Sequence, residues 1–202
     1  ETEFDGIVGG SSALGAISIT GALDLDADIT SATSLSVSTT SNLGADVTTS
    51  GTQQYDGAVT LSADNTLTTT SNGSVSFGST TNGAQTLAIT TNGTGDVTFT
   101  DDVGESAGLN GLTISTNDFN AVDLKVGGTI SITNTGTSSD ITGVIADDDT
   151  AAVFTKAGAG SLTLSGTNTY TGITTISAGT LSISADNNLG NPDTLDADRL
   201  TF

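Results

Sequence analysis

Carboxylates are the residues of this chain best able to do chemistry. The chain has 23 acidic residues against three basic ones, which gives a formal net charge of −20. In one segment the acids alternate with apolar residues, so on an extended strand the carboxylates of Asp24, Asp26 and Asp28 would share one face. Oxygen ligands at that spacing can hold Ca²⁺, although the Gly and the closing Glu of an EF-hand loop are not in place. A solvated polar face is the competing interpretation, and it is the one we favour.

A second acidic segment has adjacent rather than alternating carboxylates. It consists of Asp147, Asp148 and Asp149. Adjacent like charges are unfavourable unless a cation or water screens them, so Ca²⁺ is again the ligand that these residues could hold. We favour loop solvation here also, because the repeated glycine-rich nonapeptide of Ca²⁺-binding β-rolls is absent. The sequence therefore predicts no firmly bound cofactor, with Ca²⁺ as the cation to test.

Composition argues against catalysis. The chain has no His and no Cys, so the common pairs of nucleophile and base cannot be built. Paired carboxylates could still act as acid and base in a polysaccharide-cleaving β-helix. Sugar subsites usually need aromatic platforms and basic residues, whereas aromatic residues make up only 4% of this chain. We therefore predict that the chain is not an enzyme, and we keep a glycan-binding or polysaccharide-cleaving β-helix as the alternative.

The charge also limits the partners of the chain. A net charge of −20 repels the phosphates of nucleic acids and the surfaces of anionic membranes. No apolar run approaches the length of a transmembrane helix. We therefore expect neither nucleic-acid binding nor direct membrane insertion by this segment.

The apolar residues that must build the scaffold come in short triplets with a polar residue in the middle. This period of two places the apolar members on one face of a strand. Clusters of Gly, Asn and Asp separate the triplets, as turns require, and helix signals are almost absent. Typical triplets are Ile17–Ile19, Leu35–Val37, Val75–Phe77, Leu112–Ile114 and Leu162–Leu164.

The spacing of the triplets predicts how the strands are arranged. Leu162, Leu181 and Leu200 follow one another at intervals of 19 residues, and intervals elsewhere run from 18 to 22. Self-similarity at about 20 residues is typical of solenoids. We therefore predict an all-β fold, a single right-handed parallel β-helix over residues 1–202 with about ten coils of roughly 18–24 residues. An antiparallel sandwich, with a turn every 8–12 residues or so, is the structural alternative.

One internal match has a constant offset of 115 residues. Residues 47–57 align without gaps on residues 162–172, and the alignment places Tyr55 opposite Tyr170. We interpret the match as a duplicated structural unit. Equivalent positions in a repeat favour a structural role at a corner for both tyrosines over an exposed contact to a ligand.

The C-terminal part of the chain resembles the autotransporter-associated β-strand repeat. Its motif, from Lys156 to Leu181, reads KAGAGSLTLSGTNTYTGITTISAGTL. The motif contains the Lys, the Gly-rich step, the Leu-Thr-Leu-Ser-Gly segment, the Asn-x-Tyr-x-Gly segment and the Gly-Thr-Leu strand of that family. We assign residues 154–202 to this repeat. Lys156 occupies the family's Lys position, and we expect its side chain to point to solvent or to pair with a nearby acid.

The preceding part, residues 11–153, resembles repeats of large filamentous-haemagglutinin-like adhesins. The segments that carry this resemblance are GTQQYDGAVTL at residues 51–61 and NGAQTL at residues 82–87. Both families imply extracellular β-helical stalks on Gram-negative bacteria, and neither implies catalysis by the repeats. The resemblances therefore imply a structural or adhesive module at the bacterial cell surface, with a host or cell-surface ligand as its partner.

The two ends of the chain suggest a second kind of partner. The last triplet, Leu200–Phe202, has no strand after it, and residues 1–10 show no capping helix. A β-helix finishes in an open strand edge unless something covers it. We therefore expect a homo-oligomer or a filament that forms by end-to-end stacking of strands. A Ca²⁺-dependent adhesion module is a further alternative.

Overall fold

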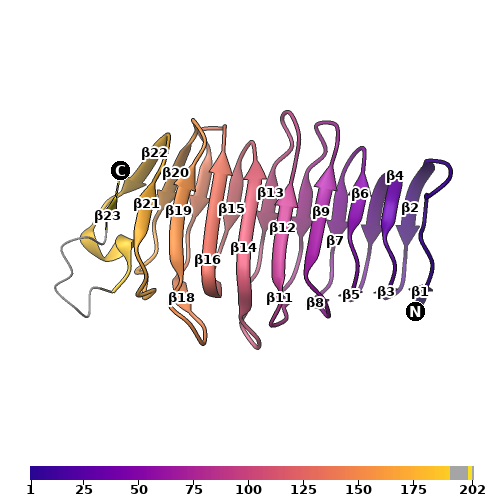
Figure 1. Cartoon of the computed structure of the whole chain (residues 1–202), viewed down its shortest axis with the longest axis horizontal. Helices are drawn as coiled ribbons and strands as arrows, with labels where there is room; N and C mark the ends of the chain where they lie inside the picture. Colours follow the sequence, from indigo (N-terminus) through magenta and orange to yellow (C-terminus); the bar gives the residue numbers. More distant parts are fainter. Residues whose placement is uncertain (192–199, 202) are drawn as a thin grey trace.

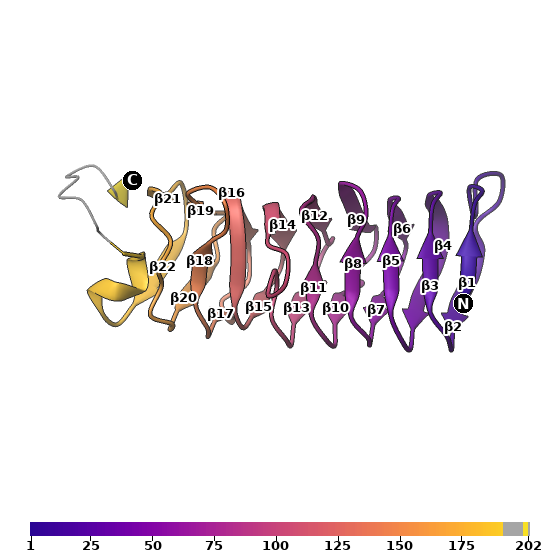
Figure 2. The same ribbon diagram turned by 90° about the horizontal axis from the view of Figure 1, so that it is seen from below.

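The chain folds into a right-handed parallel β-helix, shown from the side in Figure 1 and from below in Figure 2. The structure is a computed structural model that describes residues 1–191 and 200–201. Every pairing of strands within the described residues is parallel. The predicted fold is therefore confirmed, with about nine turns where the sequence suggested ten, and the antiparallel sandwich is wrong.

Three sheets run along the rod, and most turns of the chain add one strand or bridge to each sheet. Sheet I begins with β1 (Thr2–Phe4), β3 (Leu23–Leu25), β5 (Ser41–Leu43), β8 (Val59–Leu61) and β11 (Thr81–Asn82). Single bridges at Val103 then connect it to the start of β16 (Leu124–Asn134), which pairs with β18 (Ile145–Asp147).

Sheets II and III complete the cross-section. Sheet II contains the first part of β4 (Ile29–Val37), β6 (Val47–Thr49), β9 (Asn65–Thr69), β12 (Thr86–Thr90), β14 (Leu109–Thr116), the later part of β16, β19 (Val153–Ala157), β21 (Thr174–Ile176) and β23 (Leu200–Thr201). Sheet III contains β2 (Leu14–Ile19), the later part of β4, β7 (Gln53–Tyr55), β10 (Val75–Phe77), β13 (Val97–Phe99), β15 (Phe119–Ala121), β17 (Ser139–Ile141), β20 (Ser161–Leu164) and β22 (Thr180–Ile183). A short 3₁₀ helix, η1 (Asp186–Leu189), follows β22. The described part of the chain contains no helix with the length and hydrophobicity of a membrane span.

The strands stay in register along most of the rod although the turns differ in length, with shifts in the pairings β4–β6 and β14–β16. The turn that separates Leu23 from its partner Ser41 is short, whereas the turn that separates Thr174 from its partner Leu200 is considerably longer. Most inward apolar residues therefore still stack on an apolar residue of the next turn, as Leu112 does on Ile130. The period-two triplets identified in the sequence are therefore the strand positions that fill the core.

Aromatic rings form a continuous stack inside four successive turns. The ring centroids of Tyr55 and Phe77 are 5.3 Å apart, and those of Phe77 and Phe99 are 4.4 Å apart with nearly parallel planes. Phe119 continues the stack edge-on at 6.2 Å from Phe99. All four rings are buried, so this stack fills the core of these turns.

The two tyrosines are structural, but they do not occupy equivalent positions. Tyr55 lies in β7 of sheet III, whereas Tyr170 lies beside sheet I, where its backbone N–H donates to the carbonyl oxygen of Ile145. Both side chains are fully buried, and their hydroxyls bond to Gln53 at 3.2 Å and to Thr174 at 2.7 Å. The interpretation of the constant-offset match as a structural duplication is therefore wrong, because turns of unequal length place matched residues on different sheets.

A row of buried polar side chains closes the corner between sheets II and III from the inside. Thr69 Oγ1 donates to the carbonyl oxygen of Gly73 at 2.6 Å, and Thr91 Oγ1 donates to that of Gly95 at 2.7 Å. Two turns further on, Asn134 Nδ2 donates to the carbonyl of Gly136 at 3.2 Å. Each bond satisfies a loop carbonyl that would otherwise lose its hydrogen bond to water on burial.

Lys156 bonds to the same corner in a later turn from a different inward position, and the expectation that its side chain faces solvent or pairs with an acid is wrong. It pairs in register with Ile132 and is fully buried. Its Nζ donates to the carbonyl oxygens of Ala157, Gly158 and Ala178 at 2.6, 3.1 and 3.4 Å. Burial lowers the pKa of the Lys156 ammonium. The long apolar stem suits the core, and the loop carbonyls take the place of a carboxylate.

Candidate functional site

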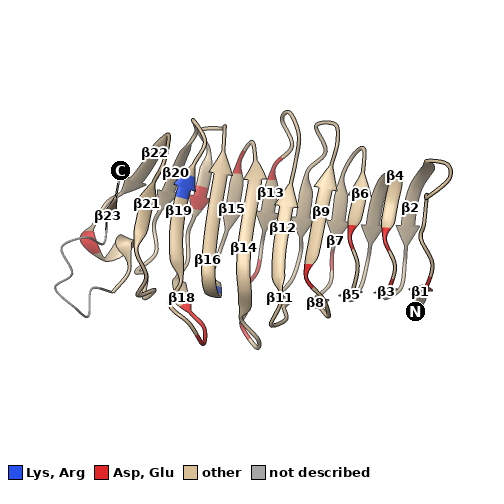
Figure 3. Ribbon diagram, viewed as in Figure 1, with Lys and Arg blue, Asp and Glu red and all other residues tan. Residues whose placement is uncertain are grey.

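Acidic residues lie mainly on sheet I and along the corners, and Figure 3 shows the ribbon of sheet II almost free of acidic residues. At the corner between sheets I and II, successive turns place an aspartate just before the strand of sheet II. Asp46 Oδ1 accepts the backbone N–H of Thr66 at 2.7 Å, and Asp64 Oδ1 accepts that of Thr86 at 2.8 Å. Asp64 has a lowered pKa because of its hydrogen bonds to Thr86. Much of the acidity therefore stabilises the corners.

Two of the three alternating aspartates meet a glutamate on the outer side of sheet I. Asp24 in β3 lies in register with Glu3 in β1. One carboxylate oxygen from each of Glu3, Asp24 and Asp26 lies within 4.8 Å of the other two. Asp28 is not in this group, because its Oδ1 accepts the backbone N–H of Asp46 at 3.1 Å. Sequence reasoning missed Glu3, which arrives from the neighbouring turn and is revealed only by the strand register.

Like charges crowd one another in this group. The pKa of Glu3 is raised, mainly by the negative charge of Asp5, with smaller contributions from burial, Asp24 and Asp26. Asn42 Nδ2 partly balances the group by donating to Asp24 Oδ1 at 2.8 Å. Three carboxylates at this separation are chemically suited to Ca²⁺, and Glu3 and Asp26 are also exposed enough to be solvated. A Ca²⁺ site here stays a prediction.

The second acidic segment does not converge on one point. Asp147 Oδ1 accepts the backbone N–H of Ala152 at 2.7 Å, and its Oδ2 accepts the hydroxyl of Thr171 at 2.6 Å. Asp148 forms an ion pair with Lys125 at 2.7 Å, and Asp149 is exposed. The three carboxylates are therefore directed to different partners, and among the described residues they do not form a compact ligand group.

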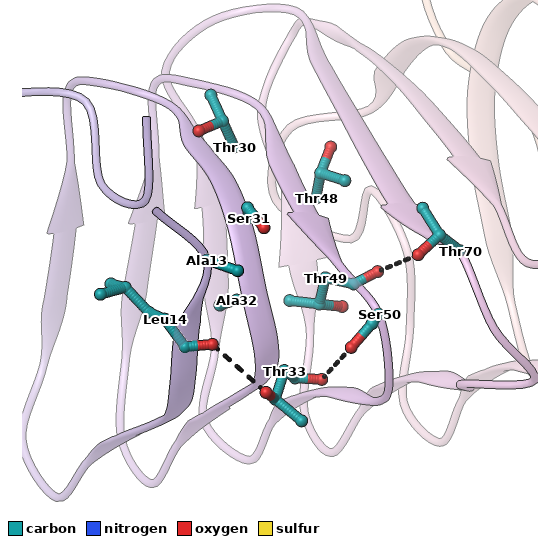
Figure 4. A pocket seen from close by; sticks show the side chains of 10 residues that line it. All are labelled: Ala13, Leu14, Thr30, Ser31, Ala32, Thr33, Thr48, Thr49, Ser50 and Thr70. Atoms are coloured by element: carbon teal, nitrogen blue, oxygen red, sulfur yellow. Dashed lines mark hydrogen bonds between the residues drawn. The ribbon is translucent and has the colours of Figure 1, made fainter. Parts of the chain in front are cut away.

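A hollow of about 250 Å³ lies near the N-terminal end, where sheet II turns into sheet III (Figure 4). A bulge in β4 helps to form it, because Ile29 pairs with Val47 and Ala32 pairs with Thr49, which leaves one residue more on β4 than on β6. Thr33 Oγ1 donates to the Leu14 carbonyl at 3.2 Å. The lining is neutral and contains Ala13, Leu14, Thr30, Ser31, Ala32, Thr33, Thr48, Thr49, Ser50 and Thr70.

A second hollow, of about 220 Å³, lies on sheet I and has an acidic rim. Asp102 and Asp123 line it, and the pKa of Asp102 is raised by burial and then by the charges of Asp123 and Asp101. The other lining residues are Val103, Glu105, Leu124, Lys125, Val144 and Ala146. Neither hollow contains an aromatic platform for a sugar ring, so the geometry gives little support to polysaccharide cleavage.

Comparison with known proteins identifies one segment of this β-helix as similar to a known repeat. Residues 154–183 match the family model described as Passenger-associated-transport-repeat. That segment runs from β19 into β22 and belongs to the same ladder of turns as the rest of the rod. The predicted resemblance to an autotransporter-associated repeat is therefore confirmed for this segment, which lies within a parallel β-helix.

A relative from Brucella is named as an autotransporter. The chain is 38% identical over 104 residues to the adhesin BmaC autotransporter of Brucella suis biovar 1 (strain 1330). The aligned region covers 46% of this chain and 3% of the relative, so the chain spans a small fraction of that protein's length. No solved structure matches the chain.

Proposed function

We propose that the chain is a non-catalytic segment of an adhesive β-helix that is carried outside the cell, at the surface of a bacterium. The observation that carries the proposal is the passenger-associated repeat at residues 154–183, which is built into the same rod as the turns before it. Similarity to a protein named as an autotransporter adhesin supports the adhesive role. A rod of stacked turns presents long, regular outer faces, and such faces suit contact with an extended partner surface.

The charges of the rod restrict the chemistry of the host or cell-surface ligand. Acids lie on sheet I and along the corners, whereas the outward side chains of sheet II are neutral. A protein or a glycan with neutral or basic contact groups can approach such a surface, and a strongly anionic polymer is repelled. We expect salt to weaken the binding of a basic ligand to sheet I.

The proposal is tested with the purified chain attached to beads that are presented to epithelial cells and to immobilised extracellular-matrix proteins. Beads coated with folded chain should bind, and beads coated with chemically unfolded chain serve as the control. Equal binding of the two preparations, or no binding above bare beads, would contradict an adhesive role of the folded rod.

A polysaccharide-cleaving enzyme is the competing function, and the acidic hollow of sheet I is where it would act. The assay measures new reducing ends on a panel of neutral and acidic polysaccharides. We expect none. Cleavage that disappears in both Asp102→Asn and Asp123→Asn, but persists in the Asp140→Asn control on sheet III, would establish the enzyme instead.

A further inference from the structure

The chain contains four Asn-Gly steps, and each is a candidate for the same covalent reaction. In that reaction the backbone nitrogen of the glycine attacks the carboxamide carbon of the preceding asparagine and closes a five-membered cyclic imide. Glycine favours the attack because it has no side chain to crowd the nitrogen. Since the four steps have the same two residues, a difference in their reactivity must come largely from the fold. The steps are Asn72–Gly73, Asn82–Gly83, Asn92–Gly93 and Asn110–Gly111.

The step Asn92–Gly93 lies in an exposed turn at the corner between sheets II and III. The backbone N–H of Gly95 donates to the carbonyl oxygen of Asn92 at 3.1 Å and closes this turn. Both residues of the step are exposed, and Gly93 has a φ of +62°. Water and hydroxide therefore reach the reacting atoms from solvent.

The side chain of Asn92 is held against the nitrogen that would attack it. Its Oδ1 accepts the backbone N–H of Gly93 at 2.8 Å, and its Nδ2 donates to the carbonyl oxygen of Thr70 at 3.2 Å. Together the two bonds assign the oxygen and nitrogen of the carboxamide. Since Cγ is bonded to Oδ1 at about 1.23 Å, the Gly93 nitrogen lies at most about 4 Å from Cγ. This approaches the separation of about 3–3.5 Å from which held groups react.

At Asn72–Gly73 the carboxamide is directed to the next turn instead. Asn72 Oδ1 accepts the backbone N–H of Thr94 at 3.0 Å. Gly73 is buried, and its backbone packs so closely on Gly51 that no Cβ would fit between them. Burial therefore screens the attacking nitrogen from hydroxide, and the hydrogen bond holds its target in another direction.

The remaining two steps belong to strands. Asn82 Oδ1 accepts the backbone N–H of Ser106 at 2.9 Å, and the N–H of Gly83 donates to a carbonyl oxygen of the neighbouring turn at 3.1 Å. Gly111 is buried within β14, where it lies in register with Thr129. Before it can react, each nitrogen must lose a buried bond or leave the ladder, which slows the reaction about tenfold or more.

We propose that Asn92–Gly93 is a site of spontaneous covalent modification, at which Asn92 loses its carboxamide through a cyclic imide. Hydroxide removes the proton from the Gly93 nitrogen, which ends its bond to Oδ1 and leaves the nitrogen facing the carboxamide. A bond forms from this nitrogen to Cγ, the bond from Cγ to Nδ2 breaks, and ammonia leaves with a proton taken from water. Water then opens the imide at either carbonyl and gives aspartate or isoaspartate. Nothing is oxidised or reduced, and water is the only co-reactant.

The modification changes the corner but not the core of the rod. A carboxylate in place of the Asn92 carboxamide cannot donate to the Thr70 carbonyl, and it adds a negative charge to the corner that Asp96 also occupies. Isoaspartate in addition lengthens the main chain of the turn by one methylene. The inner side of the corner is held separately, because Thr91 Oγ1 donates to the Gly95 carbonyl at 2.7 Å. The inference concerns the chemistry of the rod and is independent of the proposed adhesive role.

Peptide mapping by mass spectrometry tests the proposal on the whole chain. The folded chain is kept in mildly alkaline buffer made with heavy-oxygen water, and conversion is followed separately at each of the four steps. Asn92 should be converted about tenfold faster, or more, than the other three asparagines. Its product should contain both aspartate and isoaspartate, each with heavy oxygen. The chain unfolded in guanidinium chloride is the matched control, because there the four steps should react at similar rates.

Release of ammonia gives a second measurement. Asn92→Gln should remove most of the early ammonia, because the longer side chain must close a larger ring. Asn110→Gln, which alters an Asn-Gly step within a strand, should leave the early ammonia unchanged. Circular dichroism checks that both variants fold.

Three results would overturn the proposal. The first is a folded chain in which Asn92 is converted no faster than the other asparagines. The second is the same advantage for Asn92 in the unfolded chain, which would show that the fold is not its cause. The third is a product at this position that contains aspartate but no isoaspartate, which would indicate direct hydrolysis. None of these results affects the bead assay of adhesion.

Discussion

Replacing Lys156 by Met separates the apolar stem of this residue from its charge. Lys156 is fully buried, and its Nζ donates to three backbone carbonyls, with the shortest bond, to Ala157, at 2.6 Å. Met keeps an unbranched apolar chain of similar length in the core. The variant Lys156→Met therefore leaves the packing nearly intact and removes the donor that closes the corner.

The carbonyls left behind determine the size of the effect. A buried acceptor that loses its partner costs about 1–3 kcal/mol. The bonds to Ala157 and Gly158 belong to the corner loop, whereas Ala178 is exposed and its carbonyl can turn to water. Removing the ammonium also removes the cost of burying it, which offsets some of the loss. We expect Lys156→Met to lower the free energy of unfolding by about 2–4 kcal/mol in urea titrations at neutral pH.

The same variant should alter the dependence of stability on pH. Burial lowers the pKa of Lys156 in the folded chain, whereas the unfolded side chain titrates near 10.4 or so. Between these two pKa values the unfolded state binds more protons, so the stability of the wild type rises with pH. Burial raises the pKa of Tyr55 and acts in the opposite direction above about pH 10, but it does so in both proteins. The difference in stability between wild type and Lys156→Met should therefore grow as the pH rises toward about 10.4.

Lys125 supplies the matched control, because Lys125→Met removes the same charge from an exposed position. Its ion pair with Asp148, at 2.7 Å, is partly solvated, and such pairs contribute about 0–1 kcal/mol. If Lys156→Met is no less stable than Lys125→Met, and if its stability follows pH as the wild type does, the corner-closing role of the ammonium is refuted.

Three further predictions concern the core and the acidic group. Phe99→Ala should lower the free energy of unfolding by about 3–5 kcal/mol in urea titrations, because it opens a cavity in the aromatic stack beside Phe77; a loss below about 1 kcal/mol would show that neighbouring rings collapse into the gap. Glu3→Gln should raise the melting temperature at neutral pH but not at pH 3 or so, since the raised pKa of Glu3 means that its ionised form destabilises the fold; equal shifts at both pH values would refute this. A chelator should leave the melting temperature unchanged, and a rise with added Ca²⁺ that Asp24→Asn abolishes would establish a Ca²⁺ site instead.

The fold could be predicted from the sequence because a parallel β-helix requires a simple repeated pattern of apolar triplets. Each triplet such as Leu112–Ile114 supplies two inward residues, and the next triplet stacks on it one turn later, as Ile130–Ile132 does here. The regular spacing of the triplets along the chain then indicates the number of turns. The exact count is less accessible, since the turns are unequal in length.

Details that depend on neighbouring turns could not be predicted in the same way. The group of carboxylates includes Glu3 because the register places it beside Asp24, and a search along the chain finds only the acids next to each other in sequence. The charge of Lys156 predicts a surface position, whereas the strand register places its side chain inward. Tyr55 and Tyr170 look equivalent in sequence but lie on different sheets, because similarity of residues does not fix their phase within the turn.

Because of the aromatic stack, the turns of the rod should differ in their resistance to pulling. Each turn is held by its two neighbours, so under tension the turns detach successively from an end rather than all at once. A turn of about 20 residues that pulls out lengthens the tether by roughly 60 Å. We expect the turns joined by Tyr55, Phe77, Phe99 and Phe119 to resist longest, because their rings contact one another across the turns. A cell held by such a rod would yield in steps under shear and would keep a stiff middle section that rewinds the released turns when the load falls.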